Sequence, residues 1–519
     1  MNPNNTSPAK NLLCQSKFHS IFDEKTVRYQ LRLIESAVSE NVDDESAYAP
    51  IISSNVLARQ SGSENEQNQI TQYGLLAGST SIRDSTESED DSPLTRLNRD
   101  PRLLYNVSHP SSIFICGSQG SGKSHTLSCI LENCLIPSNA GGLPNPLTSI
   151  IFHYDTFISD TSGSPCEAAF LSSDPGVQVR VLCSPTNTHS IRGTYSRFNI
   201  PVDPLELDES HLNTKRMMDL MAVGQDDGSI PLYTHTIKRI LREMRIEQQR
   251  KKGSGIFSYQ DFKGRLMSSS LTTAQLAPLK QRLDTLESFM PQEQVSPWKR
   301  RARPSLSNWE SWEPVPGRLT IVDLSCPCIA PETACSLFNI CLGIFLEQDP
   351  SIGRVVALDE AHKYMDASTE SRAFTDTLLA TVRLQRHLGT RVIISTQEPT
   401  VSTNLLSLCN VTIVHRFTSP AWLQILQKHI AAAAKHPFTS NAIHEGGSEA
   451  SDSGDNRSLF DRIVQLRVGE ALLFAPSAVV KASLREDGQV QFHQLGSDYL
   501  TVKVRQRLTT DGGKSVCSS

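Results

Sequence analysis

The sequence predicts an α/β fold in which a parallel β-sheet is sandwiched between helices. Two observations lead to this prediction. A short apolar run, Ile113 to Ile115, ends in a glycine-rich loop that opens directly into a helical pattern. Farther along, from residue 318 to residue 416, apolar runs of strand length alternate with helical segments. Strands that are apolar throughout and alternate with helices are typical of a parallel sheet with both faces covered.

The glycine-rich loop, residues 117–124, has the complete GxxxxGKS pattern of a phosphate-binding loop. Its glycines allow a tight curl that points successive N–H groups at one anion, and the following helix adds its positive N-terminal end. The Lys123 ammonium can bridge terminal phosphates, and the Ser124 hydroxyl can ligate Mg²⁺. The strand–loop–helix context favours this interpretation over a chance glycine-rich turn. We therefore expect ATP and Mg²⁺ as cofactors, with the nucleotide bound by Gly117, Ser118, Gln119, Gly120, Ser121, Gly122, Lys123, Ser124 and His125.

The remaining elements follow from apolar patterns of strand and helix length. The region 204–290 has a helical pattern throughout, so we expect an all-helical insertion between core strands. Short strands within 459–504 are expected to complete or cap the domain. The expected core strands are 147–154, 177–183, 318–324, 354–358, 390–395 and 410–416, and the helices between them are 331–346 and 371–388.

Polar side chains follow the predicted strands: Asp323, Asp359, Glu360 and Gln397. The carboxyl ends of parallel strands meet at one edge of the sheet, where ligands bind. Asp359 suits a contact to Mg²⁺ through water, because magnesium keeps most of its hydration shell. Glu360 is placed to polarise the water that attacks the γ-phosphate, and Gln397 to hold that water or the phosphate. The alternative for the acidic pair is the acidic first turn of a surface helix.

Hydrolysis also needs positive charge on the transition state beyond Lys123. Four arginines lie in or after the segment that follows the acidic pair, where a neighbouring subunit could receive one of them. We expect Arg386 to act in this way, then Arg383, with Arg416 as a third candidate and Arg391 the remaining one. A salt bridge on a helix surface is the alternative for each of them.

Composition sets limits on the class of protein. The net charge of −5 and the pI near 6.3 argue against a uniformly basic, nucleic-acid-coating protein, although a local basic patch stays possible. The N-terminus lacks a secretory signal pattern, and no apolar run reaches the length of a membrane span. The 12 cysteines are scattered, so we expect an intracellular soluble protein with free thiols, cytoplasmic or nuclear, and no membrane partner. A metal cluster of Cys326, Cys328, Cys335 and Cys341 is less expected than buried structural thiols.

The predicted domain organisation has one large folded domain. Residues 1–100 are rich in polar and acidic side chains and are expected to form a largely disordered N-terminal region. Residues 101–505 are expected to form the P-loop ATPase domain, with the helical insertion at 204–290 and a flexible loop at 440–458. Residues 506–519 are expected to form a C-terminal tail.

The motif series from residue 317 onward resembles the HerA/FtsK superfamily of ring-forming P-loop ATPases, and the HerA branch most closely. The resemblance covers about residues 101–505. The chain differs at Glu398, where an arginine is usual, and in residues 1–100, which lack the pattern of the small β-barrel that HerA proteins carry. The matching motifs are LTIVDLS with Asp323, VVALDEAHKYM with Asp359 and Glu360, the segment with Arg383 and Arg386, TQEP with Gln397, the segment with Cys409, Asn410 and Arg416, and Val468 to Leu472.

This resemblance implies an ASCE-class, RecA-like ATPase that assembles as a hexameric ring and pumps a polymer, typically double-stranded DNA, through its channel. The DEAH letters alone do not indicate a superfamily 2 RNA helicase, because the rest of that motif series is not visible. Two alternatives stay open at this point. One is a nucleotide-gated scaffold that hydrolyses little ATP, and the other is a translocase of protein.

Overall fold

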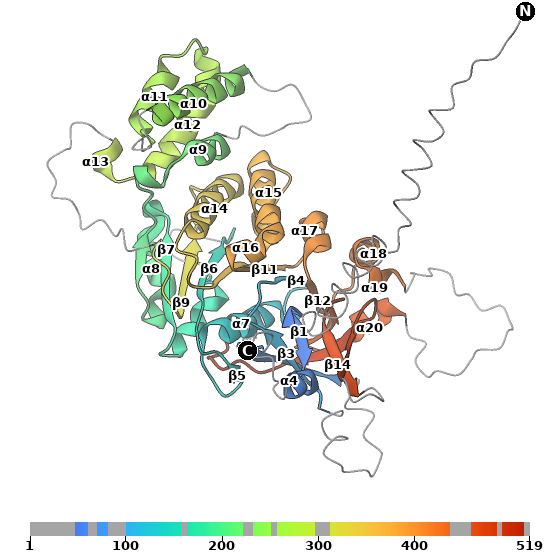
Figure 1. Cartoon of the computed structure of the whole chain (residues 1–519). Helices are drawn as coiled ribbons and strands as arrows, with labels where there is room; N and C mark the ends of the chain where they lie inside the picture. Colours follow the sequence, from blue (N-terminus) through green and yellow to red (C-terminus); the bar gives the residue numbers. More distant parts are fainter. Residues whose placement is uncertain are drawn as a thin grey trace, which may run out of the picture.

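The computed structural model describes residues 47–60, 70–80, 100–156, 159, 163–221, 232–250, 257–295, 312–435, 458–484 and 490–512. Within these residues the strands form one continuous sheet with helices on both faces (Figure 1). The strand order is β15-β14-β1-β3-β2-β16-β13-β12-β4-β11-β10-β6-β9-β7-β8, with the short β5 paired to β2. None of the helices in this described part is both long and apolar enough to cross a membrane.

The half of the sheet from β12 to β8 is parallel, as the sequence predicted. β11 lies between β4, which precedes the glycine-rich loop, and β10, which precedes the acidic pair. The carboxyl end of β11 therefore lies between these two motifs. The parallel strands are β4 (Ser112–Cys116), β6 (Thr148–His153), β7 (Gln178–Cys183), β8 (Val202–Pro204), β9 (Arg318–Asp323), β10 (Arg354–Leu358), β11 (Thr390–Thr396) and β12 (Val411–Val414).

Alternate residues of these strands enter two separate cores, because successive side chains point to opposite faces of a sheet. In β4, Phe114 belongs to one core and Ile113 and Ile115 to the other, and all three are fully buried. The first core also holds α14 and α15, whereas the second holds α7 and α8. These helices are α7 (Lys123–Leu135), α8 (Thr188–Tyr195), α14 (Pro331–Leu346) and α15 (Thr369–Arg383).

The described residues of the segment 204–290, where the sequence predicted an all-helical insertion, are mainly helical. They extend beyond α14 and α15, and α10, α11 and α12 form a group at the top of Figure 1. An ion pair of 2.7 Å between Arg282 and Glu370 joins α12 to the start of α15. The helices of this segment are α9 (Thr214–Leu220), α10 (Leu232–Arg250), α11 (Tyr259–Met267), α12 (Thr273–Ser288) and α13 (Gln292–Val295).

The other half of the sheet is mainly antiparallel and corrects one prediction. Residues 47–60 and 70–80, expected within a largely disordered region, form β1 (Ile51–Ser53), α4 (Ser54–Gln60) and β2 (Tyr73–Ser79). The prediction failed because the apolar pattern of these segments is short and interrupted by polar sequence. Their burial depends on strands that are distant in the chain. The rest of residues 1–100 lies outside the described residues. The partners of β1 and β2 are β3 (Arg102–Asn106), β5 (Gly141–Gly142), β14 (Val479–Leu484) and β16 (Leu500–Val504). The remaining strands of this half are β13 (Glu470–Phe474), which pairs with β16, and β15 (Val490–Gln494), which pairs with β14.

A second correction concerns the predicted C-terminal tail. Residues 505–512, here named the C-terminal strap, dock on α7 instead of extending freely. The fully buried carboxylate of Glu132 accepts hydrogen bonds from the backbone N–H groups of Leu508 and Thr509, both at 3.0 Å, and from the Thr509 hydroxyl at 2.6 Å. It also pairs with the Arg505 guanidinium at 2.6 Å. Residues 513–519 and most of the predicted flexible loop at 440–458 lie outside the described residues.

Four further helices come after β11 in the chain, and two short 3-10 helices come after β6 and β10. They are α17 (Thr403–Leu408), α18 (Pro420–His429), α19 (Ala431–Ala434), α20 (Leu459–Gln465), η2 (Glu167–Ser173) and η7 (Ala361–Lys363), and α16 (Gln385–Leu388) lies at the opposite edge, before β11.

Candidate nucleotide site

The glycine-rich loop joins β4 to α7 and needs its glycines for conformation. Gly117, Gly120 and Gly122 have φ values of 150°, 70° and 113°, which L side chains rarely adopt. At Gly117 the requirement is also steric, because an added Cβ would lie 2.7 Å from the Cβ of His415. The loop therefore closes against β12, whose last residue immediately precedes this histidine.

His415 is a support of the loop that sequence reasoning missed. It is fully buried, its Nδ1 donates to the Glu470 carbonyl oxygen at 3.0 Å, and its Nε2 accepts from the Thr126 hydroxyl at 2.9 Å. Burial lowers the pKa of His415 to about 4, so the imidazole is neutral near pH 7. A neutral ring adds no charge beside Lys123. The signal was present in the sequence, since the position directly follows an apolar strand.

Internal hydrogen bonds hold the loop in its curl. The Ser118 carbonyl oxygen accepts from the Ser121 hydroxyl at 2.7 Å and from the Lys123 ammonium at 3.0 Å. Ser118 in turn donates its N–H and its hydroxyl to the Arg416 carbonyl oxygen, both at 2.8 Å. Burial lowers the pKa of Lys123, although Glu360 and Asp359 oppose this shift. The lysine is thus placed between the loop and the two carboxylates.

Glu360 occupies a strained position at the end of β10. Its φ of 49° lies in the left-handed region, which costs a residue other than glycine about 1–3 kcal/mol. Its Oε2 accepts a hydrogen bond from Gln397 Nε2 at 2.9 Å, which confirms that β10 and β11 bring these two side chains together. His362, which the sequence analysis did not single out, lies 3.5 Å from the same oxygen. Burial lowers the pKa of this imidazole.

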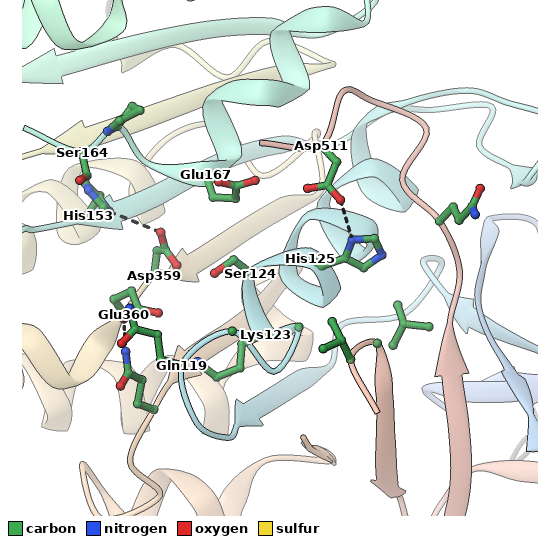
Figure 2. A pocket seen from close by; sticks show the side chains of 18 of the residues that line it. Gln119, Lys123, Ser124, His125, His153, Ser164, Glu167, Asp359, Glu360 and Asp511 are labelled. Atoms are coloured by element: carbon green, nitrogen blue, oxygen red, sulfur yellow. Dashed lines mark hydrogen bonds and ion pairs between the residues drawn. The ribbon is translucent and has the colours of Figure 1, made fainter. Parts of the chain in front are cut away.

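Asp359 lies in a buried polar environment beside His153. The His153 Nδ1 is 3.4 Å from Asp359 Oδ2 (Figure 2). The Cys166 thiol donates to the same oxygen at 3.5 Å. Burial alone would raise the pKa of Asp359, but His153, Cys166 and Lys363 outweigh it and lower the pKa. Among the described residues, Asp359 Oδ1 has no hydrogen-bond partner. It is therefore available to the water shell of a magnesium ion, and Ser124 lies in the same cavity.

The phosphate loop and the side chains at the ends of β10 and β11 line one cavity of about 620 Å³, within the usual size range of small-molecule sites. Six of the nine residues predicted to bind nucleotide line it; Gly117, Ser118 and Ser121 instead shape the loop behind it. Asp359, Glu360 and Gln397 line the opposite side. The remaining wall comes from segments that the sequence analysis did not connect with the site: His153, Ser164, Pro165, Glu167, Lys363, Val468, Gly469, Lys503, Val504, Arg505, Gln506 and Asp511.

The C-terminal strap supplies part of this wall and contacts the phosphate loop helix directly. The Arg505 carbonyl oxygen accepts from His125 Nε2 at 2.8 Å, and Asp511 Oδ2 lies 3.7 Å from His125 Nδ1 (Figure 2). Arg507, whose side chain is 1% exposed, pairs with Glu167 at 2.9 Å. No local pattern in the sequence could indicate these contacts, because they join residues more than 300 positions apart.

None of the four predicted arginines lines this cavity, although Arg416 contacts the phosphate loop through its carbonyl oxygen. Arg386 and Arg383 are exposed and precede β11, so they lie toward the edge of the sheet opposite the phosphate loop. The Arg386 guanidinium stacks 5.2 Å from the centre of the Tyr48 ring. Arg391 is buried and donates to the carbonyl oxygens of Val107 and Ser108, so it serves the packing of the core. An action of Arg386 or Arg383 on a neighbouring subunit stays a prediction.

Asp323, predicted among the strand-end carboxylates, does not line the cavity. It is fully buried, and its Oδ2 accepts from the Tyr195 hydroxyl at 2.7 Å. Of the four cysteines weighed as a metal cluster, Cys326, Cys335 and Cys341 are buried, whereas Cys328 is exposed.

No protein-family model and no curated protein sequence matches the chain. Among solved structures it is similar to VirB4 of Thermoanaerobacter pseudethanolicus, with 11% identity over 76% of this chain and 89% of that chain, at a TM-score of 0.38. It is also similar to the plasmid coupling protein TrwB in complex with ADP and Mg²⁺, with 11% identity over 85% and 95% of the two chains, at a TM-score of 0.44. For the genome packaging NTPase B204 from Sulfolobus turreted icosahedral virus 2, in complex with ATP-γS, the identity is 10% over 74% and 97%, and the TM-score is 0.27. The fold class stated above rests on the strand order and pairing.

Proposed function

We propose that the chain is an ATP-hydrolysing motor ATPase of the HerA/FtsK type that uses Mg²⁺. The observation that carries this proposal is the placement of Glu360 in the cavity that the phosphate loop lines. Gln397 donates to this carboxylate at 2.9 Å, and Lys123 lines the same cavity. A site that only binds nucleotide has no need of a carboxylate held in a strained conformation beside the phosphates.

In this mechanism the loop and Lys123 hold the phosphates, and the N-terminal end of α7 stabilises their charge. Ser124 directly, and Asp359 through water, would hold Mg²⁺, which would supply positive charge to the phosphate oxygens. Glu360 accepts a proton from the attacking water, and Gln397 orients that carboxylate. The wall formed by Val468 and the C-terminal strap would then receive the nucleoside.

A ring of six subunits that translocates double-stranded DNA is the finer part of the proposal, and it follows from the motif series. HerA proteins carry a small β-barrel ahead of the ATPase core, which the sequence of residues 1–100 does not predict. In this chain β1, β2 and β3 provide β-structure ahead of the phosphate-loop strand, which makes this difference smaller. Exposed Arg386 and Arg383 lie away from their own site, as arginines that serve a neighbouring site would.

The test compares the ATPase rate of the purified full chain with that of Glu360→Gln. We expect unchanged ATP affinity and a turnover lower by roughly 10²–10⁴-fold, the usual contribution of a general base. Glu398→Gln is the matched control, because this exposed neighbouring carboxylate does not line the cavity. Unchanged turnover in Glu360→Gln would contradict the assignment.

The same rates measured with double-stranded DNA at low and moderate salt test the polymer. Stimulation by DNA that falls steeply with salt supports a DNA translocase, because contacts to phosphate depend on salt. Hydrolysis that requires Glu360 but ignores DNA would point to a protein substrate. ATP binding without turnover in the unmodified protein would favour a nucleotide-gated scaffold.

A further inference from the structure

Three different metal-ligating side chains meet beside the nucleotide cavity: His153 and Asp359, which line it, and Cys166. All three are buried, and their ligand atoms lie within 4.8 Å of one another. They come from three separate segments, namely the end of β6, the residue before η2 and the residue after β10. An imidazole nitrogen, a thiolate sulfur and a carboxylate oxygen are the donors that zinc takes in proteins, whereas magnesium takes oxygen donors.

The two separations from the Asp359 oxygen fit one tetrahedral ion. With usual zinc–ligand lengths, a tetrahedron places the nitrogen about 3.3 Å from the oxygen and the sulfur about 3.6 Å from it. The observed separations are 3.4 Å from His153 Nδ1 to Asp359 Oδ2 and 3.5 Å from Cys166 Sγ to the same oxygen. Both donors are thus spaced from the carboxylate oxygen as coordination requires, and the ligand atoms of His153 and Cys166 lie within 4.8 Å of each other.

The imidazole of His153 lies at ion-pair distance from Asp359 but forms no hydrogen bond with any described residue in this arrangement. Within the part of the chain that the structure describes, neither ring nitrogen of His153 has a hydrogen-bond partner, although its side chain is only 5% exposed. The separation of 3.4 Å from Asp359 therefore lacks hydrogen-bond geometry. Buried ring nitrogens without partners are costly, and a coordinated ion would satisfy one of them.

A supporting contact holds the cysteine in place. The Cys166 N–H donates to the Tyr195 hydroxyl at 2.9 Å, and that hydroxyl donates to Asp323 at 2.7 Å. Partners of this kind orient metal ligands and tune their affinity. This contact also gives buried Asp323 a role outside the cavity.

We propose that His153, Cys166 and Asp359 form a site for a thiophilic divalent cation of the Zn²⁺ class, which inhibits ATP hydrolysis by taking the carboxylate that Mg²⁺ needs. On coordination the Cys166 thiol releases its proton to solvent, and water from the cavity fills the fourth position. His153 and Asp359 line the cavity, so the ion enters by that route. The inhibitory part rests on the proposed function, but the binding part does not.

The binding test uses Co²⁺ as a spectroscopic substitute for Zn²⁺ in the full chain. We expect one cobalt ion per chain, with a sulfur-to-cobalt charge-transfer band that Zn²⁺ displaces. The band should disappear in Cys166→Ser and weaken in His153→Gln. Cys328→Ser is the matched control for an exposed thiol and should keep the band. A band that persists in Cys166→Ser, or that disappears in Cys328→Ser, would overturn the site.

The two replacements, Cys166→Ser and His153→Gln, are made separately, so that a folding defect in one leaves the other informative, and circular dichroism checks both.

The inhibition test adds equimolar Zn²⁺ during ATP hydrolysis at fixed Mg²⁺. We expect the rate of the unmodified protein to fall roughly tenfold or more, because the cavity site favours zinc. Excess Mg²⁺ should relieve the inhibition. A cobalt band without zinc inhibition would overturn the inhibitory part, and absence of ATP hydrolysis would bear only on the proposed function.

Discussion

Removal of the Glu132 carboxylate should release the C-terminal strap from α7. In Glu132→Ala, the N–H groups of Leu508 and Thr509 and the Thr509 hydroxyl lose their acceptor. The Arg505 guanidinium loses its carboxylate partner and keeps only neutral acceptors. Breaking one side of a buried ion pair costs about 3–5 kcal/mol, and each orphaned buried donor costs about 1–3 kcal/mol. Water can satisfy the donors of the released strap and so offsets most of the cost of orphaning them. We therefore expect a net loss of about 3–5 kcal/mol.

Native-state hydrogen exchange at Leu508 and Thr509 measures this release. A loss of about 3–5 kcal/mol lowers amide protection by roughly 10²–10³·⁵-fold, since 1.4 kcal/mol is a factor of ten. Nucleotide affinity should fall as well, because Arg505 and Gln506 line the cavity. Glu247→Ala is the control, because its pair with Arg265 is on the surface and is worth about 1 kcal/mol at most. Unchanged protection at Leu508 and Thr509 in Glu132→Ala would refute the reasoning.

Three further outcomes follow from the same geometry. Gly117→Ala should abolish ATP binding, measured by calorimetry, because its Cβ would lie 2.7 Å from His415, whereas Gly193→Ala, which meets nothing within 4 Å, should not affect binding. Burial opposes the ionisation of Glu132, but its backbone, hydroxyl and arginine partners lower its pKa. The stabilisation from this carboxylate is therefore complete above its unfolded pKa near 4.5 and is lost as the pH falls through its folded pKa. Hydrogen exchange of the strap should accordingly rise on acidification, and exchange independent of pH after correction for the intrinsic rate would contradict this. Arg386→Ala should leave ATP affinity intact and lower turnover by about 10³–10⁵-fold if the arginine serves a neighbouring subunit. An unchanged rate would mean that Arg386 has a packing role against the Tyr48 ring and no role in hydrolysis.

The phosphate loop and the strand-end residues could be predicted because their chemistry is local. The spacing of glycines, Lys123 and Ser124 determines how the backbone can curl around an anion, whatever surrounds it. Glu360 and Gln397 each follow an apolar strand within two residues, and parallel strands end at one edge of the sheet. Their hydrogen bond of 2.9 Å is the expected result of that arrangement.

The sequence by itself thus determined the parallel core, the loop and the facing carboxylates of this protein. Only the tertiary structure decided that β1 and β2 join the sheet and that the strap closes the cavity against Glu132. It also decided that His153 and Cys166 meet Asp359. The physical reason is the range of the contacts: periodicity reports which residues are buried in an element, but the partner of a buried polar group is set by packing between segments hundreds of residues apart.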